Sequence, residues 1–141
     1  MLLGTYQHAL DAKNRIIIPS KLMDELSGKL YNYPAANKTC IKLYDEEHWT
    51  RYAEIIANLP QEIRYGVQNR IFPNSQQVAP DAQNRVPIPA VMLEKVGIVG
   101  KNVVTVGMGE YCEIWDPGKY EAAQSAPVSP EIERVIASMG F

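Results

Sequence analysis

The chain has 141 residues and a formal net charge of −2; 46% of its residues are hydrophobic and 21% are charged. This balance is typical of a folded protein and excludes a disordered chain, while the slight acidity excludes indiscriminate adhesion to nucleic acid, which requires a large positive excess. There is no secretory leader, no apolar run near the roughly 20 residues that span a bilayer, and no metal-ligand spacing around the two cysteines, so we expect a cytoplasmic protein without metal, cofactor or membrane partner.

In chain order the first element is a turn over residues 11–15. Asp11 is suited to accept backbone N–H bonds from residues further along, and Asn14 tolerates the left-handed conformation that a tight turn needs. The β-branched run that follows, residues 15–18, predicts a strand, so we expect the turn to join the two strands of a β-hairpin, in this copy and in the second. Pro19 ends this strand and suits the first turn of a short helix, with apolar positions Leu22, Met23 and Leu26 and a stop near Gly28.

Two further strands are expected at residues 29–33 and 39–44. Asp45 then has the position of a helix N-cap, and the helix at 46–58 has one apolar stripe and ends before Pro60. The stripe consists of Trp49, Tyr52, Ala53, Ile56 and Leu59. Residues 61–70 are compatible with another helix, and 71–79 are expected to run extended.

The chain then repeats itself. Residues 11–19 return as 81–89, and Leu43-Tyr44-Asp45 returns as Ile114-Trp115-Asp116. The second copy therefore predicts a turn at 81–85, a strand at 85–88, a helix with Met92, Leu93 and Val96, and strands at 102–106 and 111–115. Asp116, followed by Pro117, is expected to cap the next helix. Cys40 and Cys112 do not occupy corresponding positions in the two copies, so we expect buried thiols without a functional role common to both repeats.

These elements predict a mainly β fold with short helices, of the α+β class. We divide the chain into a first repeat at 1–60, a connecting segment at 61–77, a second repeat at 78–125 and a helical tail at 126–141. Neither repeat is large enough to bury a good core alone, so the two are expected to pack together as one sheet structure.

The duplicated Asp-x-x-x-Arg turn, the opening Met1-Leu2-Leu3-Gly4 and the Ile114-Trp115-Asp116 step closely resemble the MraZ family. The resemblance covers the chain to about residue 125. It implies two AbrB-like swapped-hairpin repeats packed as one pseudo-dimeric β-barrel. It also implies a ring-like homo-oligomer in the nucleoid that binds direct repeats in double-stranded DNA. On this resemblance the protein represses the division and cell-wall gene cluster, including its own promoter.

The sequence departs from the family pattern in two places. The residue before the turn arginine, usually Gly, is Asn14 in the first copy and Asn84 in the second. Asn adopts the same left-handed backbone at modest cost, so the expected fold is unchanged. Pro87 lies inside the second expected strand, which fits only an edge position or a bulge.

The expected DNA-binding residues belong to the first copy: Lys13, Asn14, Arg15 and Lys21. Between residues 8 and 21 the cations outnumber the single acid, whereas residues 78–91 hold one of each. A two-stranded ribbon fits the major groove, where Arg makes bidentate contacts with guanine, while Lys meets phosphates. Arg15 is assigned to DNA mainly on the family resemblance. Structural turn roles are expected for Asp11, Asp81, Asn84 and Arg85.

Two other classes of protein were weighed. An enzyme would use Asp11 and Asp81 as paired carboxylates and His8 as a base. The duplication makes these aspartates equivalent turn residues, and no phosphate-binding loop or nucleophile motif appears, so we expect neither an enzyme nor a small-molecule substrate. The alternative is an AbrB-like protein-interaction module of antitoxin type; two motifs and a short tail after Ser125 favour self-assembly instead.

Overall fold

The computed structural model describes all 141 residues. Its strands are β1 (Thr5–Ala9), β2 (Arg15–Ile17), β3 (Leu30–Pro34), β4 (Ile41–Asp45), β5 (Gln76–Val78), β6 (Arg85–Pro87), β7 (Asn102–Gly107) and β8 (Cys112–Trp115). Its helices are α1 (Ser20–Met23), α2 (Glu46–Ala57), α3 (Gln61–Ile71), the 3₁₀ turn η1 (Phe72–Asn74), α4 (Ala90–Lys95), α5 (Pro117–Ser125) and α6 (Pro130–Ser138). The predicted α+β class is confirmed.

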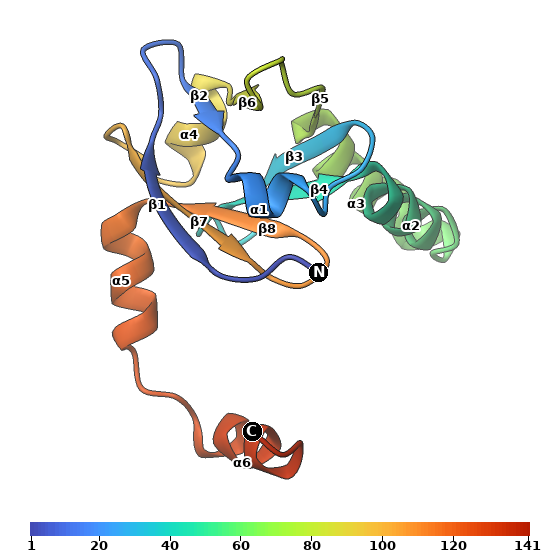
Figure 1. Ribbon diagram of the computed structural model, residues 1–141. Coiled ribbons are helices and arrows are strands. Elements are labelled where there is room, and N and C mark those ends of the chain that lie inside the picture. The colour runs from blue at the N-terminus through green and yellow to red at the C-terminus, as the bar shows by residue number, and fades with distance from the viewer.

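The two repeats exchange strands (Figure 1). The larger sheet has the order β1-β7-β8-β4-β3-β5, so β1 of the first repeat pairs with β7 of the second. In the same sheet β5, which leads into the second repeat, pairs with β3 of the first. At the centre β4 pairs with β8, with Lys42 opposite Glu113. A separate two-stranded ribbon joins β2 to β6, one strand from each repeat. The sheets therefore cannot form from one repeat alone.

The expectation of a hairpin around each Asp-x-x-x-Arg turn was wrong in one respect. Each repeat does contain one ordinary hairpin, β3–β4 or β7–β8. The strands that flank the turns, however, pair with the other repeat and not with each other. Hydrogen bonds from the aspartate side chain stabilise each turn although the two strands beside it do not pair with each other. Both strands can therefore pair with the other repeat.

The core lies between the repeats and draws on both. Its 18 buried residues include Ile16 and Ile18 from the first repeat and Val86 and Ile88 from the second. Each of these four side chains is at most 2% exposed. Burying a side chain of this size contributes about 1.5–3 kcal/mol. Cys40 and Cys112 are free and buried, as expected.

The helix α2 packs against β3 and β4, and α3 packs against α2 (Figure 1). Asp45 caps α2, because its Oδ1 accepts the His48 N–H at 3.1 Å, and Trp49 stacks on Tyr31 with ring centroids 5.1 Å apart. The predicted cap and stripe are thus confirmed. The extended run predicted for residues 71–79 is confirmed only in its second half, where β5 forms. Its first half was wrong, because α3 continues to Ile71 and leads into η1, after which Ser75 Oγ donates to the Ile71 carbonyl at 2.6 Å.

The first helix is shorter than expected, ending at Met23, so Leu26 enters the core from the loop that follows. Asp116 caps α5 by accepting the N–H groups of Gly118 and Lys119. The last helix, α6, stands apart from the sheets (Figure 1) and exposes its apolar side chains Ile132, Val135 and Ile136. None of the helices combines the length and apolarity needed to cross a membrane.

Candidate nucleic-acid interface

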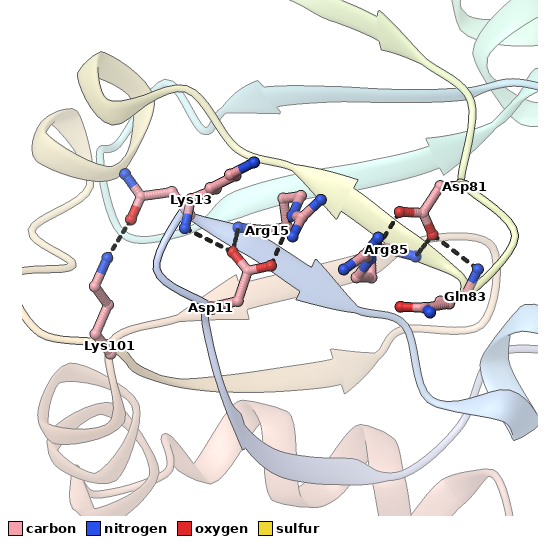
Figure 2. A network of polar contacts seen from close by, with 8 residues as sticks. Asp11, Lys13, Arg15, Asp81, Gln83, Arg85 and Lys101 are labelled. Carbon is pink, nitrogen blue, oxygen red and sulfur yellow. Dashed lines mark hydrogen bonds and ion pairs between the residues drawn. The ribbon is translucent and has the colours of Figure 1, made fainter.

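The first turn is organised by one carboxylate. Asp11 Oδ1 accepts the backbone N–H groups of Lys13 and Arg15, each at 2.9 Å, and Asp11 Oδ2 accepts Arg15 Nε–H at 2.6 Å (Figure 2). Asn14 has a φ of 56°, the left-handed conformation expected for it. The pKa of Asp11 is lowered from 3.8 to about 2, chiefly because the carboxylate accepts the Arg15 backbone N–H and further because it binds the Arg15 guanidinium. Asp11 therefore stays ionised and fixes both the turn and the stem of Arg15.

The second turn repeats this geometry. Asp81 accepts the N–H groups of Gln83 and Arg85 at 2.9 Å and Arg85 Nε–H at 2.7 Å, and Asn84 has a φ of 59°. The same N–H bond from Arg85 lowers the pKa of Asp81. Each carboxylate is fully engaged by its own turn, as the structural roles predicted for Asp11 and Asp81 require.

The ribbon brings the two turn arginines onto one face. In the β2–β6 register Arg15 lies opposite Pro87 and Ile17 lies opposite Arg85, while Ile16 and Val86 alternate to the buried face. Both arginine side chains are 27% exposed, and Figure 2 shows them on neighbouring strands. Pro87 is tolerated because each strand of a two-stranded ribbon has a free edge, as predicted.

The terminal nitrogens of both arginines are unoccupied. Arg15 and Arg85 each use Nε for the turn aspartate, and neither Nη1 nor Nη2 makes a hydrogen bond within the chain. The four Nη–H donors of each guanidinium are therefore available to an external acceptor. The planar fork suits the paired acceptors of a guanine edge or a phosphate.

A lysine that the sequence did not single out joins the first turn. Lys101 Nζ donates to Asn14 Oδ1 at 2.6 Å, and the Lys101 carbonyl accepts the Leu10 N–H at 2.7 Å (Figure 2). The residue is 87 positions away from Asn14 in the sequence and arrives because β1 pairs with β7. Its place beside Asn14 could be predicted only by knowing that β1 pairs with β7 of the other repeat. The first turn thus brings Arg15 together with Lys13, which is exposed, and Lys101, and both lysines lie on the same side of Arg15 (Figure 2).

Not all the expected DNA-binding residues lie together. Lys13, Asn14 and Arg15 share the first turn, but Lys21 lies on α1. Ile18 N–H donates to the Asn84 carbonyl, so the chain has already reached the second turn three residues before Lys21. The second turn has Gln83 where the first has Lys13, and the Asn84 side chain has no lysine partner.

His8 has a packing role. Its Nε2 lies 2.7 Å from Thr105 Oγ1, and burial lowers the pKa of the imidazole, which favours the neutral form. No group of three or more His, Cys, Asp and Glu side chains gathers as it would around a metal ion.

Comparison with known proteins matches both repeats. The family model described as "MraZ protein, putative antitoxin-like" matches residues 1–63 and again 71–133. The chain is 32% identical to "Transcriptional regulator MraZ" of Clostridium tetani over the full length of both chains. It is 33% identical to the proteins of that name from Lachnoclostridium phytofermentans, over 86% of each chain, and Mycoplasmoides gallisepticum, over 89% of each chain.

Proposed function

This chain belongs to the MraZ family, and we propose that it is a sequence-specific, double-stranded DNA-binding transcriptional regulator. The observation that carries the proposal is the ribbon face, on which Arg15 is anchored through Nε and keeps its Nη donors free. The relatives are named transcriptional regulators, not enzymes, and both turn carboxylates are committed to turn geometry.

The first turn is the reading element of this proposal. The β2–β6 ribbon enters the major groove, Arg15 reads a guanine edge through Nη1 and Nη2, and Lys13 and Lys101 meet phosphates beside the first turn. Asn14 orients Lys101 and contributes a secondary contact. Lys21 meets the backbone from α1. At the second turn, where no lysine flanks the arginine, Arg85, Asp81 and Asn84 maintain the turn.

The finer architecture follows the same family reasoning. The exchanged pairs β1–β7 and β3–β5 support two AbrB-like swapped-hairpin repeats closed as one pseudo-dimeric β-barrel. In this proposal the repeats occupy 1–60 and 78–125, with a connecting segment at 61–77 and a tail at 126–141.

A single chain offers few cations to DNA, so several copies must act together. The exposed apolar face of α6 and an apolar groove between α2 and the sheet are both unburied within one chain. Covering them in a ring-like homo-oligomer would place several ribbons along one duplex and multiply the effective affinity. The proposed targets are direct repeats upstream of the division and cell-wall genes, including its own promoter, where the cytoplasmic, nucleoid-associated protein acts as a repressor.

Binding to a promoter duplex with short direct repeats tests this function. We expect cooperative binding that weakens steeply with salt and falls when one repeat is scrambled, because phosphate contacts and avidity both contribute. Light scattering on the same sample gives the size of the assembly. A well-assembled protein with no preference for repeats over scrambled duplex would contradict the proposal and favour an interaction module of antitoxin type.

A further inference from the structure

A basic pocket away from both turns has no role in the function proposed above. It is a cavity of about 290 Å³ between the β3–β4 turn, the end of α3 and η1, and the end of α4. Lys38, Arg70 and Lys95 line it, and no acidic residue does. In a chain whose net charge is −2, a concave surface lined by one sign of charge is notable, because it concentrates the field on anything that enters.

Two of the three pocket cations, Arg70 and Lys95, are positioned by neutral groups. Arg70 Nη2 donates to the Ala36 carbonyl at 3.3 Å, and Lys95 Nζ donates to Asn74 Oδ1 at 2.8 Å. Neither residue forms an ion pair with a carboxylate, in contrast to Arg15, Arg51 and Arg85. The side chains are oriented while their charges remain uncompensated.

A further lysine supports the same loop. Lys119 Nζ donates to the Lys38 carbonyl at 3.0 Å and to the Val96 carbonyl at 2.8 Å. It therefore ties the β3–β4 turn to the end of α4 and adds positive charge behind the pocket. Lys38 itself has a φ of 59°, which fixes the direction in which its side chain leaves the turn.

We propose that this pocket binds a small molecule with more than one phosphate group. Several uncompensated cations favour a multivalent anion over a single carboxylate, and an arginine fork beside ammonium groups matches phosphate oxygens. The cavity is small and concave, which suits a diphosphate better than the outer surface of a duplex. The cations come from the first repeat, the connecting segment and the second repeat, so the ligand bridges the parts of the chain that exchange strands.

Calorimetric titration with inorganic pyrophosphate tests the proposal. We expect saturable binding at one site per chain, weakened about tenfold by Arg70→Gln and by Lys95→Gln, since each removes one charge-assisted contact. Arg134→Gln, on the detached α6, is the matched control and should leave the affinity unchanged. Circular dichroism and light scattering verify that the variants fold and assemble.

Three outcomes would overturn it: no saturable binding, an equal loss in all three variants, which would indicate diffuse charge, or displacement of pyrophosphate by a duplex without target repeats. The last result would assign the pocket to the DNA backbone. The test does not depend on specific DNA recognition, so it separates this inference from the proposed function.

Discussion

Ile16 and Val86, which hold the same position in the two repeats, are direct partners at the centre of the β2–β6 ribbon, and both are completely buried. This pair places an approximate two-fold axis through the ribbon. Because side chains alternate along a strand, the neighbouring residues Arg15 and Arg85 both lie on the opposite face. The duplication therefore places both turn arginines on one face of the ribbon, over one shared core.

The pH dependence of stability tests the turn geometry. The pKa of Asp11 is lowered to about 2, so its contribution to stability is present above about pH 4 and is lost as the pH falls toward 2. Asp11→Asn should lower stability at neutral pH and flatten its decline between pH 4 and 2. Urea unfolding at several pH values measures this, with Asp24→Asn as the control because its side chain makes no hydrogen bond. An unchanged acid slope in Asp11→Asn would show that the turn bonds do not form in solution.

Substitutions at Asn14 test its left-handed backbone. Asn14 has a φ of 56°. Asn14→Gly should change the free energy of unfolding by less than about 1 kcal/mol, because Gly adopts this conformation freely. Asn14→Val should lower the free energy of unfolding by about 1–3 kcal/mol, because a β-branched residue is strained there. Thermal unfolding compares the two variants. Equal stability of the Gly and Val variants would contradict the turn conformation.

Asn32 is a buried amide without a hydrogen-bond partner. Thr105 holds the position of Asn32 in the second repeat, and its hydroxyl contacts His8. The residue that corresponds to His8 near Asn32 is Val78, which offers no hydrogen-bonding side chain. Asn32→Val should therefore raise the free energy of unfolding by about 1 kcal/mol or more, because an unpaired buried amide is costly. Thr105→Val, which leaves His8 unpaired, should lower it. A destabilised Asn32→Val protein would mean that the amide is satisfied in solution.

The exposed stripe of α6 tests assembly. The double variant Ile132→Asp, Ile136→Asp should reduce the mass measured by light scattering, because a charge cannot be buried against another copy at low cost. Glu133→Gln, on the same helix, is the control and should retain the assembly. Retention of the full mass by the double variant would exclude this stripe from the interface.

The local features of the fold were predictable from sequence. Asp45 and Asp116 cap helices, and Asp11 and Asp81 close turns, because each acts on a backbone within four residues. The exchange of strands was implied only by the family resemblance. No local pattern determines whether the strands flanking a turn pair with each other or with the other repeat.

The sequence brings candidate residues together only where they are local. Lys13, Asn14 and Arg15 share one turn, and their role in DNA binding stays a prediction. Lys101 was missed because it reaches Asn14 through the β1–β7 register. Lys21 was grouped with them on sequence proximity, although the ribbon carries the chain toward the other turn first. The pocket around Arg70 and Lys95 was missed for the same reason.

The most direct test of the central claim compares Arg15→Ala with Arg85→Ala in binding to a direct-repeat promoter duplex at two salt concentrations. We predict that Arg15→Ala abolishes specific binding while light scattering shows an intact assembly, and that Arg85→Ala retains it. Retained specific binding by Arg15→Ala, or no binding by well-assembled wild-type protein, would contradict the assignment of the first turn as the DNA-reading element.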